Sequence, residues 1–164
     1  MPDGSYQSII RDITQRKIAQ EELIRKNQEI DIYFTSSLDL LCIADTDGHF
    51  IRLNPEWERV LGYPVNELEG SVFLDFVHPD DIQKTVDRIG NLINQEVVTS
   101  FENRYRHKDG SYRWIEWRSR PQGKLIYAAA RDITERKLAE EELERTKIQL
   151  KEIIMQSPLP IVLA

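Results

Sequence analysis

The chain has 164 residues, which is enough for one domain with its own core and some additional segments. It is 40% hydrophobic and 30% charged, with a mean hydropathy of -0.50. No stretch reaches the roughly 18 apolar residues of a membrane span, and the first residues lack the apolar core of a signal peptide. The net charge of -6 argues against nucleic acid as a partner, and the single Cys42 excludes an internal disulfide and favours a reducing, cytoplasmic location.

Two segments of the chain repeat each other at an offset of 120 positions. Residues 11–26 read RDITQRKIAQEELIRK, and residues 131–146 read RDITERKLAEEELERT. The likeness continues from 21–44 to 141–164, and DGSY occurs at both 3–6 and 109–112. A fixed period with incomplete ends is typical of an array of similar domains. We therefore interpret the chain as a piece of a longer protein, with residues 1–12 as the last strand of a preceding unit.

Helices are predicted on both sides of a central unit. Residues 13–36 and 135–155 are rich in Glu, Lys, Gln, Arg, Leu and Ile and contain neither Gly nor Pro, which favours linker helices. In each copy an Asp is followed three residues later by Gln or Glu, a pattern that caps helix starts, and the Thr two residues after the Asp is an alternative cap. These residues are Asp12, Thr14 and Gln15 in the first copy and Asp132, Thr134 and Glu135 in the second.

The apolar residues of both helices follow a spacing of 4, 3, 4 and 3, which is the narrow seam of a heptad repeat with one polar position in its middle. We interpret the seam as a parallel dimer contact, with a lone amphipathic helix lying on its own domain as the alternative. The seam residues are Ala19, Leu23, Lys26, Ile30 and Tyr33 in the first helix and Ala139, Leu143, Thr146, Leu150 and Ile153 in the second.

The central unit, residues 37–134, is predicted to be α+β with a mainly antiparallel sheet. Residues 39–45 and 49–53 form a hairpin around the turn at 46–48. Short helices follow at 54–63, where Asn54 is the expected cap, and at 64–70. A longer helix at 78–95 begins with acidic residues that suit its N-terminus and has the predicted buried stripe Val86, Ile89, Leu92 and Ile93. Strands are expected at 97–108, 111–120 and 124–133.

The order of motifs in this unit resembles a Per-Arnt-Sim (PAS) sensory domain with its C-terminal PAC segment. The resemblance rests on LCIADTDGHFIRLNPEWERVLGYPVNELEG, FLDFVHPDD, RYRHKDGSYRWIEWRSRP and AAARDITERK, which together cover nearly all of residues 37–138. It implies a five-stranded antiparallel sheet with short helices on one face, and it makes RDIT the junction between the last strand and an outgoing signalling helix. Residues 156–164 then look like the start of a following PAS domain.

Arrays of this kind resemble the input halves of sensor proteins, most often histidine kinases and sometimes cyclic-dinucleotide enzymes. The chain contains no kinase phosphoacceptor box and no ATP-binding glycine boxes, so we expect no catalysis by this segment and an output domain, such as a kinase, further along the parent chain. The expected partners are a second copy of the chain and that output domain, without nucleic acid and without a membrane in this segment. A signal-relay and dimerisation module and a sensor of a small metabolite both remain open.

The resemblance places any ligand in a cavity between the sheet and the small helices, with no metal predicted. Haem-binding members carry a histidine well inside the long helix, whereas His78 lies at its start; flavin photosensors carry a cysteine near residues 67–77, whereas Cys42 lies in the first strand. Haem and covalent flavin are therefore not expected, and an unknown small ligand stays open. Residues that would line a cavity are Trp57, Phe76, Ile89, Phe101, Tyr105, Ile115 and Trp117, with core packing of the aromatics as the alternative.

Strand alternation puts Trp114 and Glu116 on one face of the sheet and Ile115 and Trp117 on the other. The charged residues of the last strands are expected to form cross-strand pairs, with an anionic ligand at Arg104 or Arg118 as the alternative; they are Glu102, Arg104, Glu116, Arg118 and Arg120. Because neither Gly nor Pro separates the last strand from the following helix, Asp132, Ile133 and Thr134 are the predicted signal junction.

Overall fold

A five-stranded antiparallel sheet forms the centre of the molecule in a computed structural model that describes residues 4–157. Its order is β2-β1-β5-β4-β3, so the first and last strands of the domain lie side by side. The strands are β1 (Leu40–Asp45), β2 (Phe50–Leu53), β3 (Val98–Arg106), β4 (Tyr112–Gln122) and β5 (Leu125–Asp132). This confirms the predicted α+β class and the antiparallel sheet.

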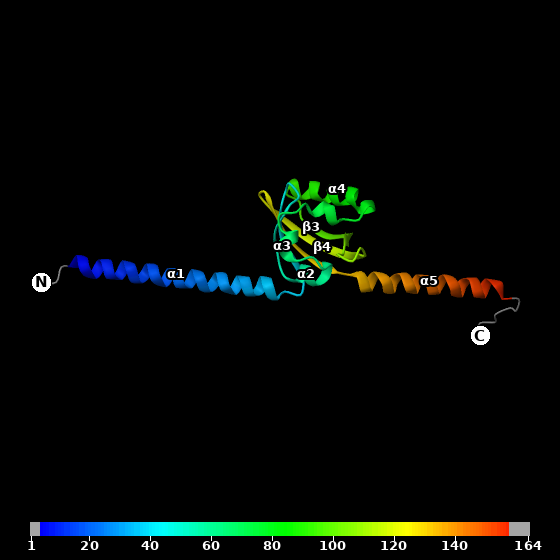
Figure 1. Cartoon of the computed structure of the whole chain (residues 1–164), viewed down its shortest axis with the longest axis horizontal. Coiled ribbons are helices and arrows are strands. Elements are labelled where there is room, and N and C mark those ends of the chain that lie inside the picture. Colours follow the sequence, from blue (N-terminus) through cyan, green and yellow to red (C-terminus); the bar gives the residue numbers. More distant parts are fainter. Residues whose placement is uncertain (1–3, 158–164) are drawn as a thin grey trace.

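Two long helices leave the domain in opposite directions (Figure 1). They are α1 (Gly4–Ser36) and α5 (Thr134–Gln156). The strand predicted for residues 1–12 is wrong where the structure describes it, because residues 4–12 continue α1. Within the part of the chain that the structure describes, these residues lie beside no strand of the sheet, and a helix satisfies their backbone groups internally. Asp12 consequently lies inside a helix and caps nothing, and residues 158–164, predicted to begin a further domain, lie outside the described residues.

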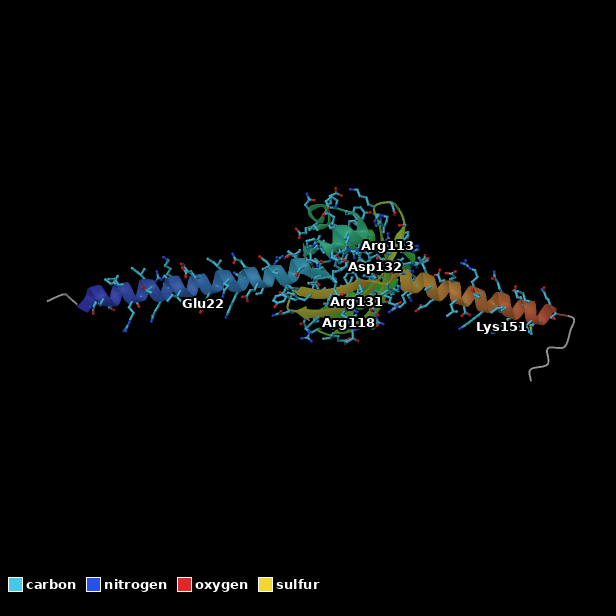
Figure 2. All side chains as sticks on the ribbon, turned by 90° about the horizontal axis from the view of Figure 1, so that it is seen from below. Glu22, Arg113, Arg118, Arg131, Asp132 and Lys151 are labelled. Atoms are coloured by element: carbon cyan, nitrogen blue, oxygen red, sulfur yellow. The ribbon has the colours of Figure 1, made fainter. Side chains whose placement is uncertain are left out.

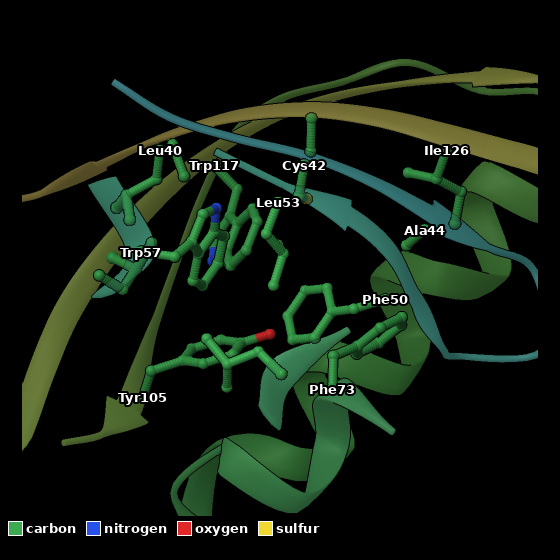
Figure 3. Close-up of a cluster of buried hydrophobic side chains, with 14 of the residues drawn as sticks. Leu40, Cys42, Ala44, Phe50, Leu53, Trp57, Phe73, Tyr105, Trp117 and Ile126 are labelled. Atoms are coloured by element: carbon green, nitrogen blue, oxygen red, sulfur yellow. The ribbon is translucent and has the colours of Figure 1, made fainter. Parts of the chain in front are cut away.

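The inner face of the sheet carries the hydrophobic core. Alternate residues of β1, β4 and β5 point inward, including Cys42, Ile115, Trp117 and Ala128, all of which are buried. In Figure 3 the rings of Trp57 and Trp117 lie close together above Tyr105, and Phe50 and Phe73 continue the cluster. The ring centroids of Trp57 and Trp117 are 5.6 Å apart. Aromatic packing therefore fills most of the space between the sheet and its helices.

Short helices cover this inner face: α2 (Glu56–Leu61), α3 (Val65–Leu68), η1 (Phe73–Phe76), η2 (Pro79–Asp81) and α4 (Ile82–Ile93). Asn54 does not cap α2 as predicted, because its fully buried side chain bonds to β1 instead. Its amide oxygen accepts from the Leu41 N–H at 2.9 Å, and its Nδ2 donates to the Asp39 carbonyl at 2.9 Å. The residue thus ties the start of α2 to the first strand.

The buried stripe of α4 is displaced from the predicted one. Thr85 and Leu92 are buried and Ile89 is half-buried, whereas Val86 and Ile93 are 42% and 51% exposed. The helix is rotated towards Thr85 because this hydroxyl accepts a hydrogen bond from the buried Asn103 amide at 3.1 Å. A polar residue thus takes a core position that the apolar pattern assigned to its neighbour.

The two helices join the domain at the same end of the sheet. In the register of β1 and β5, Leu40 lies opposite Ala130, so α1 enters β1 beside the point where β5 leads out to α5. The Arg131 Nε donates to the Asp39 carboxylate at 2.9 Å and bridges the two connections. Arg52 of β2 likewise pairs with Asp31 of α1 at 2.7 Å. None of the helices within residues 4–157 combines the length and apolar character needed to cross a bilayer.

Candidate functional site

The junction between β5 and α5 is fixed by hydrogen bonds to Trp114 of β4. The Ile133 N–H donates to the Trp114 carbonyl at 2.8 Å, and the Trp114 N–H donates to the Thr134 hydroxyl at 2.9 Å. That hydroxyl donates in turn to the Asp132 carboxylate, which also accepts the Thr134 N–H at 2.9 Å. Ile133 is buried, so the predicted junction residues form one connected unit with the sheet. Glu135 makes no such contact, and the predicted capping box is replaced by this sheet-bound turn.

The predicted cross-strand ion pairs do not form, because the register places like charges opposite each other. Glu102 of β3 lies directly opposite Glu116 of β4. Their carboxylates instead contact the first turn of α5: Lys137 Nζ lies 2.6 Å from Glu102, and Arg136 lies 3.2 Å from Glu102 and 3.7 Å from Glu116. The outer face of the sheet therefore holds the helix by charge. The sequence could have suggested this only with the register known.

Arg104, one of the two predicted anion-binding residues, is engaged by Asp81. Its guanidinium donates to the Asp81 carboxylate at 2.8 and 2.9 Å, and its backbone N–H adds a third bond at 2.8 Å. Burial alone would raise the pKa of the Asp81 carboxyl, but the bonds from Arg104 and the nearby Lys84 lower it to about 2. Asp81 was expected only to favour the start of the long helix; it also ties that helix to β3. Asp80 beside it is exposed and has no contact this close.

The Trp114 ring lies close to two of these cations, Lys137 and Arg104. The Lys137 ammonium lies 5.0 Å and the Arg104 guanidinium 5.1 Å from the ring centroid. Such distances are those of cation–π contacts. Trp114 and Glu116 lie on the outer face, as strand alternation predicts, and this face meets the outgoing helix. In Figure 2 Arg118 and Arg131 also lie over the strands, whereas Glu22 and Lys151 are on the long helices away from the sheet.

A small cavity of about 60 Å³ lies between the sheet and α4. Four of the residues predicted to line a cavity do so: Ile89, Phe101, Tyr105 and Trp117. The other three lie elsewhere. Trp57 and Ile115 are fully buried in the core, and Phe76 packs edge-on against Tyr63 at 5.2 Å. The remaining walls include the aromatic Phe73 and residues that were not predicted to line a cavity, among them Cys42, Thr85, Arg88, Asn103 and Ser119.

The surface of the cavity is mostly apolar, although Thr85, Arg88, Asn103 and Ser119 also reach it. The Tyr105 hydroxyl points into the cluster towards Phe50 (Figure 3), and burial raises the pKa of this phenol well above its usual value. Burial also raises the pKa of the Cys42 thiol to about 12. Asn103 bonds to Trp117 Nε1 at 2.7 Å as well as to Thr85. Such a lining suits an apolar group rather than a charged one.

His78 and the predicted dimer seam were also candidate functional positions. His78 lies before η2, where its Nδ1 accepts from the Asp80 N–H at 3.1 Å, and its ring packs edge-on against Tyr112. Within residues 4–157 no group of three His, Cys, Asp or Glu side chains could hold a metal ion. The predicted dimer seam is exposed along both helices, with Leu23, Ile30, Leu143, Leu150 and Ile153 each between 54% and 66% accessible.

Comparisons with known proteins indicate the family to which the central domain is similar. Residues 50–128 match a family model described as the PAS fold. A solved PAS domain of an HTR-like protein from Haloarcula marismortui superposes with a TM-score of 0.63 at 24% identity, covering 71% of this chain and 99% of that one. A probable diguanylate cyclase of Escherichia coli is 28% identical over 91 residues, which are 52% of this chain and 8% of that protein. Sporulation kinase E of Bacillus subtilis is 20% identical over 152 residues, which are 92% of this chain and 20% of that protein.

Proposed function

This chain belongs to the PAS family through its central domain, and on that premise we propose that it is a relay module that passes a conformational change in its sheet to the helix α5. The observation that carries the proposal is the hydroxyl of Thr134, the first residue of α5, which accepts from the Trp114 N–H of β4 and donates to the Asp132 carboxylate at the end of β5. A flexible connection would let the sheet move without the helix. Here the two share hydrogen bonds, so a shift of β4 displaces the start of α5.

The relay acts in a dimer through the exposed seams of α1 and α5. Leucine and isoleucine side chains repeated at heptad spacing and more than half exposed leave apolar surface that a second helix would cover. Because the two seams share their register, the parallel arrangement extends through both linkers.

The parent protein is a multidomain sensor with an output domain outside this segment, since the chain spans only 8% and 20% of the two curated relatives described above. A kinase output is favoured over a cyclic-dinucleotide enzyme because the likeness to the kinase includes the linker helices, covering 92% of the chain against 52%.

The junction is tested in the full-length parent with Asp132→Ala and Thr134→Ala. Losing a hydrogen bond of this kind costs typically about 1 kcal/mol, which is small against folding but comparable to the coupling between two sites. We expect both variants to keep the domain folded by circular dichroism and to lose the response of the output to the stimulus. Glu135→Ala, which changes the neighbouring carboxylate without touching the sheet, serves as the control. Responses equal to the parent's in both variants would refute the relay at this junction.

A second function, sensing of a small apolar metabolite, would use the cavity that Ile89, Phe101, Tyr105 and Trp117 line, and this cavity of about 60 Å³ would have to widen to admit one. A ligand that binds the folded state alone at 100 times its Kd adds about 2.7 kcal/mol to stability. Thermal unfolding of the purified chain in the presence of candidate metabolites, together with native mass spectrometry, separates the two functions. A bound or stabilising molecule supports sensing, and its absence across a metabolite library supports a relay without a ligand.

A further inference from the structure

The facing glutamates of β3 and β4 suggest a device that the fold alone does not require. Glu102 and Glu116 are directly opposite across the two strands, an arrangement that weakens strand pairing when the charges are uncompensated. Both side chains are only about a quarter to a third exposed, at 30% and 25%, so water screens their repulsion incompletely.

Of the cations on the sheet near these glutamates, Arg118 makes no ion pair with either carboxylate within 4.0 Å, and two others are engaged elsewhere. Arg131 lies opposite Glu116 on β5, but its guanidinium bonds to Asp39. Arg104, two residues after Glu102, is bound by Asp81. Among the side chains that the structure describes, those of Arg136 and Lys137 are the cations within 4.0 Å of the two carboxylates, and both belong to α5.

We propose that Glu102 and Glu116 form a latch with Arg136 and Lys137 that makes the docking of α5 and the pairing of β3 with β4 depend on each other. When the first turn of α5 leaves the sheet, the two carboxylates repel each other and the strands loosen at this point. When the strands shift apart, the two cations lose their shared site and α5 is released. The dependence is reciprocal, as thermodynamic linkage requires. This latch rests on the proposed relay function and specifies how the sheet and the helix are coupled.

Hydrogen exchange on the whole chain tests the latch without any output domain, so its failure is distinct from failure of the relay. In Arg136→Ala/Lys137→Ala the glutamates lose their partners. We expect amide exchange about three- to tenfold faster both in the first turn of α5 and in β3–β4 around Glu102 and Glu116. Alanine is the best helix former, so faster exchange in α5 does not come from lower helix propensity. Arg145→Ala/Lys147→Ala removes the same charges from the same helix away from the sheet and should change neither segment.

Neutral glutamines separate the attraction from the repulsion. Glu102→Gln/Glu116→Gln removes both, so α5 should exchange faster while β3–β4 exchanges as in the native chain. Adding Glu102→Gln to Arg136→Ala/Lys137→Ala should restore protection in β3–β4 and leave α5 fast. The latch is overturned if Arg136→Ala/Lys137→Ala leaves β3–β4 like the control, or if Glu102→Gln fails to restore it.

A salt titration gives a second measurement should the double alanine variant fail to fold. At about 1 M salt the screening length is about 3 Å, so exchange in the first turn of the native α5 should rise. The Glu102→Gln/Glu116→Gln variant should respond less. Equal responses of the two proteins would overturn the latch.

Discussion

At the scale of single residues, the Asp81–Arg104 pair places a buried carboxylate under three hydrogen bonds from one arginine. Asp81 is 3% exposed. Asp81→Asn removes the charge and leaves Arg104 without its partner, so we expect a loss of about 2 to 3 kcal/mol in the free energy of unfolding, measured in urea. Asp80→Asn, next to it and exposed, should cost less than about 0.5 kcal/mol. Equal effects of the two changes would contradict the role of the pair.

The same pair makes a pH-dependent contribution to stability. The folded pKa of Asp81 is lowered to about 2, below the value of about 3.9 for an unfolded aspartate. Its contribution is therefore complete above about pH 4 and is lost as the pH falls towards 2. The difference in unfolding free energy between the native chain and Asp81→Asn should shrink over this range and stay constant between pH 5 and 7, values above both pKa values.

Cys42 gives a further prediction from one residue. Burial raises the pKa of its thiol to about 12, so at neutral pH it is protonated and enclosed. Because the thiolate is the reactive form, the native chain should react with a thiol reagent only as fast as it unfolds. Full reactivity should appear in denaturant. Rapid labelling of the native chain would contradict the buried position of β1.

At the scale of elements, introducing a charged residue into the predicted seam of α5 tests whether the seam is a dimer contact. Leu143→Asp or Leu150→Asp places a carboxylate at the proposed helix contact, and we expect sedimentation to show a shift towards monomer while the circular dichroism of the domain is kept. Ile148→Asp is the matched control, since Ile148 is 50% exposed but lies off the seam. A native chain that sediments as a monomer, or an unchanged mass for both seam variants, would reject the seam.

The elements differ in how far the sequence could predict them. Strand positions followed from local alternation and turn residues, and α5 followed from helix formers and the absence of Gly and Pro. Asn54 was misassigned because its partners, the backbone groups of Leu41 and Asp39, are distant in the sequence. The Glu102–Glu116 pairing depends on the register of the β3–β4 hairpin, which the geometry of the turn at 107–111 sets and which the apolar pattern of the strands does not show. Of the candidate site, the junction residues were found because the motif is local, and the cavity lining was found only in part.

At the scale of the whole molecule, the purified chain should be colourless. Haem requires an available ligand, but His78 lies before η2 with its Nδ1 accepting the Asp80 N–H, and covalent flavin chemistry requires a reactive cysteine, but Cys42 is enclosed in β1. We therefore expect absorbance from aromatic residues alone. A Soret band or a flavin band in freshly purified protein would refute this.

The shared attachment point of α1 and α5 has a mechanical consequence. Because Leu40 and Ala130 are paired at the end where both helices join, tension pulling the helices apart would not load β1 and β5 along their length. It would separate the two strands from one end, in an unzipping geometry. The Asp39–Arg131 ion pair would break first, followed by one residue pair after another towards Asp45 and Leu125. A domain loaded in this way unfolds at low force, so under tension we expect it to open before the helices α1 and α5 do.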